Sequence, residues 1–237
     1  MNIKAIFFDI GGTLYKEKKF EIAPWASKLS SFLKKQCLSI APDKIYSTYV
    51  NVRDELIKGA IDSIEIWHLS ILTLTLSRLN IIPNPRLVME AYKLFTESLM
   101  EIMEPYKGVH EIMEWLKSKG LKIGIVSNTG SHYLIYRILE KDDLLKYVDS
   151  LVTSQMVSWR KPDRRIFLYA CSTLNVKPSE SVHVGNDPIA DVLGAKNAGL
   201  TVIQKISEHT PKSDLADAVI TKLEEIKHII EKLMRFS

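Results

Sequence analysis

The chain has 237 residues, of which 46% are hydrophobic and 25% are charged, and this balance excludes a disordered or collagen-like protein. Lys and Arg exceed Asp and Glu by only 32 to 28, without a basic cluster, which argues against a nucleic-acid partner. No apolar run is long enough to span a bilayer, no signal-peptide cleavage pattern follows the N-terminus, and Cys37 and Cys171 form neither a disulfide framework nor a metal pair. We therefore expect a cytoplasmic chain, monomeric or homodimeric, without a membrane partner.

A first strand is predicted at residues 4–10, a nearly continuous apolar run that ends at Gly11 and Gly12. Helical patterns then dominate residues 15–105, with breaks at proline and glycine. The predicted helices span 25–36, 42–58, 63–79 and 86–103. The third of them carries apolar residues at helical spacing, which favours a buried stripe. Its members are Ile64, Trp67, Ile71 and Leu74.

From residue 106 onward, helical and strand patterns alternate. The predicted strands are 121–127, 148–153, 181–185, 200–203 and 218–220, and the predicted helices are 109–119, 131–141, 164–174, 189–198 and a C-terminal one. This alternation implies right-handed crossovers and an α/β fold with a doubly wound parallel sheet. We expect a Rossmann-like core of residues 1–14 plus 106–237, interrupted by an all-helical insertion at 15–105.

Polar residues that directly follow the predicted strands form the candidate site, because ligands of open parallel sheets bind beyond the carboxyl ends of the strands. The first is Asp9, whose carboxylate can act as a nucleophile. The alternative is an Asp that only stabilises the turn after it. Gly11 and Gly12 leave backbone amides open to an anion, and Thr13 can orient the Asp9 carboxylate through its hydroxyl.

Two further strand ends carry groups that suit an anion. Ser127 and Asn128 precede a predicted helix N-terminus, which is a natural anion site, although the same residues also serve as ordinary helix caps. Lys161 precedes Pro162, which holds it in an extended conformation, and it can neutralise both a substrate anion and Asp9. Its neighbour Arg160 is expected on the solvated face.

The last strand end is acidic. Asp187 and Asp191 lie four residues apart, and together with Asp9 they would make an oxygen site suited to Mg²⁺. Alternatively, Asp187 caps the following helix and Asp191 supports its first turn through the helix dipole. Both roles are compatible.

These motifs, in this order, resemble the haloacid dehalogenase (HAD) superfamily. The matching segments are Asp9-Ile10-Gly11-Gly12-Thr13, Ser127, Lys161-Pro162 and the run GNDPIAD at 185–191, and the helical insertion looks like that family's C1 cap. The resemblance implies a hydrolase with Asp9 as covalent nucleophile, assisted by Thr13 and Lys161. It implies binding of a small anionic substrate by Gly11, Gly12, Ser127, Asn128, Lys161 and Asn186. It implies metal binding by Asp9, the Gly11 carbonyl, Asp187 and Asp191.

Two departures from the family pattern affect the choice of reaction. Gly11 replaces the second Asp of the first motif, the general acid of the phosphatases, whose help is worth about 10²–10⁴-fold. A halide leaves without a proton, and two-haloacid dehalogenases of this family lack the same Asp and need no metal. In the fourth motif Asn186 follows the glycine and the carboxylate comes one step later, at Asp187, so which of the two reaches a metal stays open.

The extra carboxylate favours Mg²⁺-dependent hydrolysis of a small phosphorylated metabolite, because carboxylates beside Asp9 without a cation would repel one another. The alternatives are dehalogenation, a non-catalytic phosphate-binding domain, and phosphonatase chemistry through a Schiff-base lysine. The lysines available in the insertion are Lys16, Lys18, Lys19, Lys28 and Lys58. Candidates to line the cleft are Tyr15, Trp25, Trp67 and His68, with Arg53 as a partner for a substrate carboxylate.

Overall fold

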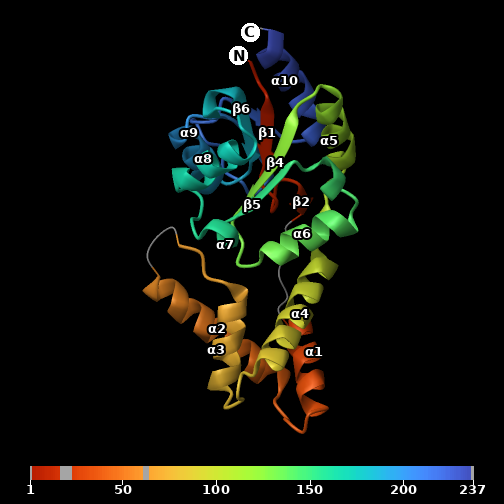
Figure 1. Cartoon of the computed structure of the whole chain (residues 1–237), viewed down its shortest axis with the longest axis vertical. Helices are drawn as coiled ribbons and strands as arrows, with labels where there is room; N and C mark the ends of the chain where they lie inside the picture. The colour runs from red at the N-terminus through yellow and green to blue at the C-terminus, as the bar shows by residue number, and fades with distance from the viewer. Residues whose placement is uncertain (1, 17–22, 61–63, 236–237) are drawn as a thin grey trace.

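The computed structural model describes residues 2–16, 23–60 and 64–235. Its centre is a six-stranded, all-parallel sheet in the order β5-β4-β1-β6-β7-β8 (Figure 1). The strands are β1 (Ala5–Phe8), β4 (Lys122–Ser127), β5 (Ser150–Thr153), β6 (Ser181–Gly185), β7 (Thr201–Lys205) and β8 (Ala218–Ile220). The predicted fold class is confirmed. Because β1 lies between β4 and β6, the residue after Phe8 emerges in the middle of the sheet edge where ligands of such folds bind.

Helices cover both faces of the sheet, and the alternation of β1 shows how. Phe7 packs into one apolar cluster with α8 and α9, whereas Ile6 and Phe8 pack into a second cluster with α5, α6 and α10. These helices are α5 (Val109–Ser118), α6 (His132–Lys141), α8 (Arg164–Thr173), α9 (Gly194–Asn197) and α10 (Ile226–Arg235). Both faces of the sheet are therefore buried, as a parallel sheet requires.

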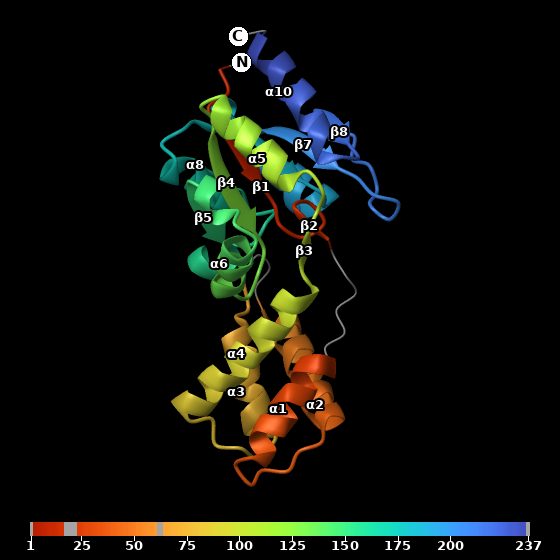
Figure 2. The same cartoon turned by 90° about the vertical axis from the view of Figure 1, so that its right-hand side faces the viewer.

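Four further helices form what we call the helical module, which lies beyond the carboxyl edge of the sheet (Figures 1 and 2). They are α1 (Ala23–Lys34), α2 (Pro42–Gly59), α3 (His68–Arg78) and α4 (Pro85–Ile102). Trp25 of α1, Tyr49 of α2 and Phe95 of α4 pack against one another, with ring centroids 5.1–5.4 Å apart, and His68 of α3 packs on Phe95 at 5.0 Å. The module joins the core through a two-stranded antiparallel ribbon of β2 (Tyr15–Lys16) and β3 (Glu104–Pro105). The exact division into core and insertion stays a prediction.

The third predicted helix differs from the structure. It begins at His68, and the predicted buried stripe is wrong for three of its four members, because only Ile71 is buried. Ile64, Trp67 and Leu74 are 38%, 43% and 42% exposed. The reason is tertiary: Ile64 forms an antiparallel bridge with Trp159 of the core, and this contact replaces a helical turn. The predicted start at residue 63 lies outside the described residues.

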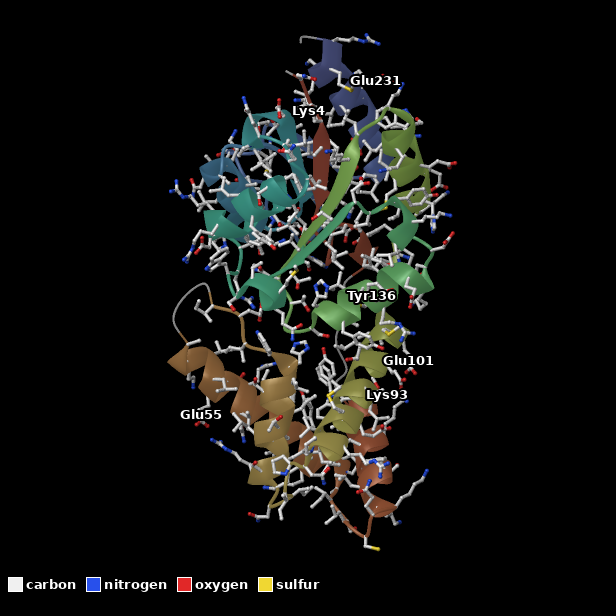
Figure 3. All side chains as sticks on the ribbon, viewed as in Figure 1. Lys4, Glu55, Lys93, Glu101, Tyr136 and Glu231 are labelled. Atoms are coloured by element: carbon white, nitrogen blue, oxygen red, sulfur yellow. The ribbon has the colours of Figure 1, made fainter. Side chains whose placement is uncertain are left out.

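The remaining differences are small. The predicted helix at 189–198 is a π-helical segment, Pro188–Leu193, followed by α9, and the sequence did not predict the short helix α7 (Ser154–Val157) or the ribbon. Short 3₁₀ turns also lie at Leu145–Tyr147, Pro178–Glu180 and Leu223–Glu225. Acidic and basic side chains alternate over the outer surface, among them Glu55, Lys93 and Glu101 on the module (Figure 3). In the described part of the chain, no helix has the length and apolarity needed to cross a membrane.

Candidate active site

Asp9 follows β1 and lies at the middle of the carboxyl edge of the sheet. Its backbone N–H donates to Val184 O at the end of β6 (2.9 Å), and its side chain is buried. The turn after it needs a glycine, because Gly12 has a φ of +70° and a Cβ atom there would lie 2.4 Å from Asn186 Nδ2. Thr13 Oγ1 lies 3.3 Å from both Asp9 Oδ2 and Asn186 Oδ1, so it can donate to either. Thr13 therefore contacts the Asp9 carboxylate, as the sequence predicts.

Lys161 reaches Asp9 from the loop that follows α7. Its Nζ donates to Asp9 Oδ1 (2.6 Å), Asp191 Oδ1 (2.6 Å) and Val126 O (3.0 Å), so each of its three N–H groups has a partner. Asn128 binds the backbone of Lys161 with both ends of its amide: Nδ2 donates to Lys161 O (2.9 Å), and Oδ1 accepts from Lys161 N (2.8 Å). Asn128 thus positions Lys161, while its expected contact with substrate stays a prediction.

Asp191 completes the buried cluster from the segment after β6. Its Oδ1 accepts from Lys161 and forms a 2.9 Å hydrogen bond with His183 Nε2. Its Oδ2 accepts from the backbone N–H groups of Asn186 and Asp187, each at 3.0 Å. Since a carboxylate offers about four acceptor positions, Asp191 is fully engaged within the protein. It orients Lys161 on one side and the loop of Asn186 on the other.

Burial and mutual repulsion shape the pKa values of these groups. The pKa of Asp9 is raised to about 7 in total. Burial is the largest cause, the charge of Lys161 acts in the opposite direction, and the charge of Asp191 adds to the rise. Burial also raises the pKa of Asp191, but Lys161 and His183 outweigh it, so that carboxyl titrates below its usual range. For Lys161, burial lowers the pKa and the two carboxylates more than offset it. The pKa of His183 is lowered by burial. Asp191 is therefore the permanent partner of Lys161, and Asp9 is the carboxylate that another cation can recruit.

A cleft of about 460 Å³ opens above this cluster. The described residues that line it are Asp9, Gly11, Ser127, Asn128, Arg160, Lys161, Pro162, Asn186, Asp187, Ile189, Ala190 and Asp191. The structure thus brings the predicted residues of all four strand ends to one cleft, apart from Gly12 and Thr13, which lie in the turn behind Asp9. A phosphate or carboxylate would meet Ser127 and Lys161 at its base.

The oxygen atoms that line the cleft are candidate ligands for Mg²⁺. In the described part of the chain, no three His, Cys, Asp or Glu side chains gather closely enough to hold a metal. Asp191 has its acceptor positions filled, and Asp187 is exposed and caps the next helical turn through Oδ1, which accepts bonds of 2.8 and 2.7 Å. Asp9 Oδ2 is freer, with a single 3.3 Å hydrogen bond, and the Gly11 backbone and Asn186 share its cleft. These oxygen donors fit Mg²⁺, which uses one or two carboxylates and completes its shell with water and substrate oxygens.

Sequence reasoning missed several residues at this site. His183 stands inside a buried strand, where an isolated polar residue is the one available signal. Lys205 ends β7 and donates to Gly12 O (3.0 Å), with its Nζ 3.6 Å from the centre of the Tyr106 ring. Burial lowers the pKa of Lys205. Lys205 thus helps to fix the turn after Asp9.

The helical module contacts the loops after β4 and before Lys161 through residues 64–68, which we call the docking segment, and Tyr92 of α4 also forms a hydrogen bond with Ser131. Glu65 N donates to Ser158 O (3.0 Å), and His68 N donates to Gly130 O (3.0 Å). Gly130 admits this contact because a Cβ atom there would lie 2.6 Å from Ile66 O. The docking segment therefore touches both the loop after β4 and the loop before Lys161.

Glu65 is the charged centre of this contact. It is buried; its Oε2 accepts from Arg160 Nη1 (2.6 Å) and from the hydroxyl of Ser154. Ser154 Oγ in turn accepts from Thr129 N (2.8 Å). Arg160 is partly solvated, as expected, with 41% of its side chain exposed. The sequence did not predict that it pairs with a buried carboxylate and lines the cleft.

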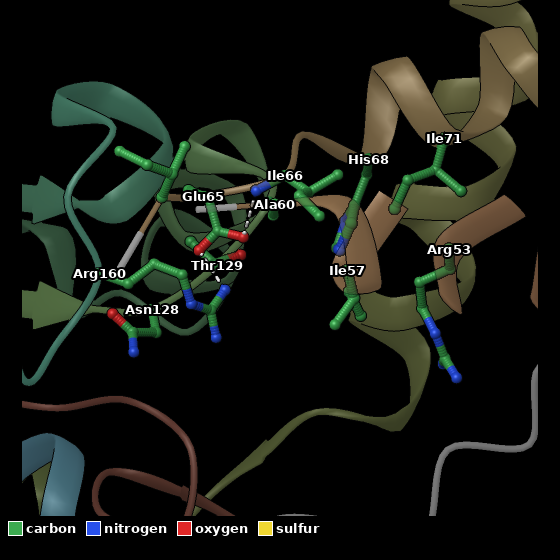
Figure 4. Close-up of a pocket in the computed structure, with 12 residues that line it drawn as sticks. Arg53, Ile57, Ala60, Glu65, Ile66, His68, Ile71, Asn128, Thr129 and Arg160 are labelled. Atoms are coloured by element: carbon green, nitrogen blue, oxygen red, sulfur yellow. Dashed lines mark hydrogen bonds and ion pairs between the residues drawn. The ribbon is translucent and has the colours of Figure 1, made fainter. Parts of the chain in front are cut away.

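A second cavity of about 430 Å³ lies between the docking segment, α2 and the catalytic loops (Figure 4). Its described lining consists of Arg53, Ile57, Ala60, Ile64, Glu65, Ile66, His68, Ile71, Asn128, Thr129, Gly130 and Arg160. Asn128 and Arg160 also line the first cleft, so the two cavities adjoin at these residues. The second cavity is walled mainly by isoleucines on the side of the module.

The residues that the sequence analysis named as candidates to line the cleft lie in different parts of the structure. His68 and Arg53 line the second cavity, whereas Tyr15 is buried and donates to Asp142 Oδ2 (2.9 Å), and Trp25 belongs to the core of the module. Trp67 lines neither cavity. The same holds for the described lysines of the insertion. These are Lys16, Lys28 and Lys58; Lys18 and Lys19 lie outside the described residues.

Two known proteins that are similar to this chain over nearly its whole length carry the same name. The chain is 29% identical to a glyceraldehyde 3-phosphate phosphatase of Methanothermobacter thermautotrophicus, over 96% of this chain and 100% of that protein. It is 27% identical to a glyceraldehyde 3-phosphate phosphatase of Pyrococcus furiosus, over 97% and 94% of the two chains.

Solved structures show the same fold. A HAD phosphatase from Thermococcus onnurineus superposes with a TM-score of 0.67 at 25% identity, over 96% of this chain and 98% of that one. A 2-haloacid dehalogenase from Pseudomonas syringae superposes with a TM-score of 0.76 at 20% identity, over 98% and 99% of the chains, which is a likeness of fold alone. The profile of the haloacid dehalogenase-like hydrolases matches residues 3–199, so the chain belongs to this family of hydrolases and the resemblance seen in its sequence motifs is confirmed.

Proposed function

We propose that this enzyme is a Mg²⁺-dependent phosphatase that hydrolyses a small phosphorylated metabolite, with Asp9 as covalent nucleophile. The observation that carries the proposal is the buried Asp9–Lys161 pair (2.6 Å) at the base of a polar cleft. Two relatives that match nearly end to end are named as phosphatases of a triose phosphate, which supports this substrate class.

The proposed reaction uses the side chains that line the cleft. Asp9 attacks phosphorus with one carboxylate oxygen, the P–O bond to the leaving group breaks, and its electron pair goes to the leaving oxygen. Lys161 orients Asp9 and offers positive charge to the phosphoryl oxygens, and Ser127 and the Gly11 amide offer hydrogen bonds. The sequence-based expectation that the Gly12 amide binds the anion is wrong, because Gly12 N donates to Tyr15 O (2.8 Å). A water molecule then attacks the aspartyl phosphate, which restores the Asp9 carboxylate and releases inorganic phosphate.

Mg²⁺ bound by Asp9, the Gly11 carbonyl and an oxygen of Asn186 or Asp187 would neutralise charge on the phosphoryl group and favour ionised Asp9. Asn186 is the better placed of the two, because its side chain contacts the Asp9 turn while Asp187 caps a helix. We assign Asp191 to holding Lys161 rather than to the metal, since its oxygens already accept four hydrogen bonds.

Dehalogenation is the main competing reaction, because Gly11 leaves the first motif without its acid. A paired assay separates the two. Release of phosphate from glyceraldehyde 3-phosphate and 4-nitrophenyl phosphate is measured with Mg²⁺ and with EDTA, beside release of halide from 2-chloropropionate. We expect phosphate release that depends on Mg²⁺ and is lost in Asp9→Asn.

The intermediate can be tested directly. Borohydride reduction of enzyme quenched during turnover converts an aspartyl phosphate to homoserine, which mass spectrometry locates at position 9. Halide release without metal would contradict the proposal. Turnover of neither substrate class, unaffected by Asp9→Asn, would favour a non-catalytic phosphate-binding domain instead.

A further inference from the structure

We propose that Arg160, held in place by Glu65 of the helical module, stabilises the negative charge on the leaving-group oxygen and so replaces the general acid missing at Gly11. The inference rests on the proposed phosphatase function and goes beyond it, because it names the group that makes a poor leaving group depart.

The position of Arg160 carries the inference. It lines both the cleft that contains Asp9 and the adjoining cavity between module and core. During phosphoryl transfer the phosphorus lies above Asp9, and the leaving group extends away from Asp9, because attack and departure are roughly in line. We place the scissile oxygen where the two cavities adjoin, because the second cavity is the neighbouring space into which a leaving group can extend. Arg160 and Asn128 are the residues that line both.

Two other polar side chains of the described cleft, Lys161 and Asn128, already have partners within the protein. Lys161 gives its three N–H groups to Asp9, Asp191 and Val126. The amide of Asn128 is bound at both ends to the Lys161 backbone. Arg160 has five N–H donors, and among the described residues Nη1 alone makes a hydrogen bond, to Glu65. Its guanidinium thus keeps donors for a substrate oxygen.

Glu65 makes the guanidinium a fixed group rather than a mobile one. Its carboxylate is 4% exposed and bonds to Arg160 Nη1 at 2.6 Å, while its other oxygen accepts from Ile66 N (3.0 Å). The hydroxyl of Ser154 holds the same oxygen as Arg160. Figure 4 shows the guanidinium beside Glu65, with His68 and Ile57 of the module across the cavity. Because Glu65 comes from the module, Arg160 is placed only when the docking segment contacts the core.

The proposed step needs no reagent other than the phosphate ester and water. The P–O bond breaks as the Asp9 oxygen bonds to phosphorus, and the electron pair of the broken bond remains on the leaving oxygen. Arg160 stays protonated and donates N–H bonds to that oxyanion, and water supplies the proton that converts it to the alcohol. A guanidinium therefore lowers the barrier most where the leaving group is least acidic.

The test is the dependence of rate on the leaving group. Ethyl phosphate, phenyl phosphate and 4-nitrophenyl phosphate are compared in the wild-type enzyme, Arg160→Met, Arg160→Lys and Glu65→Gln, with Mg²⁺ present. For Arg160→Met we expect kcat on ethyl phosphate to fall on the order of 10²-fold, as for loss of one oxyanion donor. The loss should shrink through phenyl phosphate to near zero for 4-nitrophenyl phosphate, whose leaving anion is already stable. Arg160→Lys, and ethylguanidine added to Arg160→Met, should restore part of the ethyl phosphate rate.

Controls separate this role from a structural one. Arg78 and Glu55 form a matched ion pair on the surface of the module (2.6 Å), and Arg78→Met should change no rate. Glu65→Gln should show the leaving-group dependence of Arg160→Met at smaller size. An equal loss on all three esters would overturn the inference, even if Arg160→Met is unstable, because the comparison is made within one protein preparation and repeated with Arg160→Lys. Absence of hydrolysis of every ester by the wild-type enzyme would instead overturn the proposed function.

Discussion

The loops at the carboxyl edge of the sheet and the docking segment together line the second cavity, but the two regions are built differently. At the sheet edge, Asp9, Lys161 and Asp191 are buried and joined by charged hydrogen bonds of 2.6 Å that come from three separate strand ends. Among the described residues, the docking segment is held by two backbone hydrogen bonds, by a bridge from Ile64 to Trp159, and by the contacts of Glu65 with Arg160 and Ser154.

Because the two regions are built differently, we expect them to serve different parts of the reaction. The sheet edge is a cooperative network in which each group keeps its neighbour charged and oriented, so the attacking and anion-binding groups are in place before substrate arrives. The docking segment is a small contact that brings Arg160, His68 and an apolar wall to the leaving group. Chemistry at phosphorus should therefore respond to changes at the sheet edge, and leaving-group preference to changes at the docking segment.

Loss of the central cation should have the largest effect. Lys161→Met leaves Asp9 and Asp191 buried together without a cation, which should destabilise the metal-free protein by about 3–5 kcal/mol and lower kcat/KM on the order of 10²–10³-fold. Urea unfolding in EDTA and phosphate release measure the two effects. Lys196→Met is the matched control, because it breaks an exposed pair with Asp217 (2.8 Å) and should cost about 0–1 kcal/mol. Equal losses in the two variants would contradict a cooperative edge.

Restoring an acid at position 11 should make stabilisation of the leaving group depend on the sheet edge and less on the docking segment. The backbone at Gly11 is outside the left-handed region, so Gly11→Asp is compatible with its conformation. We expect phosphate release from ethyl phosphate to rise about tenfold or more, because a carboxylic acid can protonate the leaving oxygen. The effect of Arg160→Met should shrink in this background. A rate that is unchanged or lower would show that Gly11 is not the deficiency.

Protonation of His68 should weaken the docking segment. Burial and the positive charge of Arg160 together lower the pKa of His68 from an ordinary value of 6.5 to about 4, with burial the larger cause. The stability that this neutral ring contributes is complete above pH 6.5 and is lost as the pH falls toward 4, because the unfolded chain takes up a proton that the folded one resists. Between pH 7 and 4, His68→Gln should lose about 1–3 kcal/mol less than wild type in urea unfolding. The exposed His228→Gln serves as control, and equal pH dependence of all three proteins would argue against this role.

The apolar wall should produce the smallest effect. Ile57 is 57% exposed at the second cavity, so Ile57→Asp can fold normally while making the cavity polar. Since one buried methylene is worth about 0.8 kcal/mol, KM for butyl phosphate relative to ethyl phosphate should rise several-fold. Ile82→Asp is the control, because Ile82 is 84% exposed and lines neither cavity. The same change in both variants would place the leaving group elsewhere.

The sheet edge was largely predictable, because its signals are local. Asp9 directly follows an apolar strand, and Lys161 and Asp191 lie in the segments that follow two others. The parallel arrangement brings the ends of those strands together without any further information. Asp9, Lys161 and Asp191 could therefore be named from the sequence as one site. Their detailed partners could not, since the bond from His183 to Asp191 depends on the packing of two elements.

The docking segment was not predictable for the opposite reason. Ile64 and Trp67 match helical spacing with Ile71, and periodicity alone extends the helix through them. Ile64 instead pairs with Trp159, which is far away in sequence, and Trp67 is the extended residue that precedes α3. Likewise, Arg160 next to Lys161 carries no sign of a partner, because Glu65 is contributed by another part of the chain.

The ribbon of β2 and β3 has a consequence for how such an enzyme can change. Tyr15 pairs with Pro105 and Lys16 with Glu104, so the chain leaves the core and returns to it at neighbouring positions. Once the ribbon forms, the entropy of closing the long loop between its strands has already been spent, and that cost grows only slowly with loop length. Insertions of other lengths can therefore be grafted at this junction without disturbing the sheet, which gives one nucleophile access to many substrates.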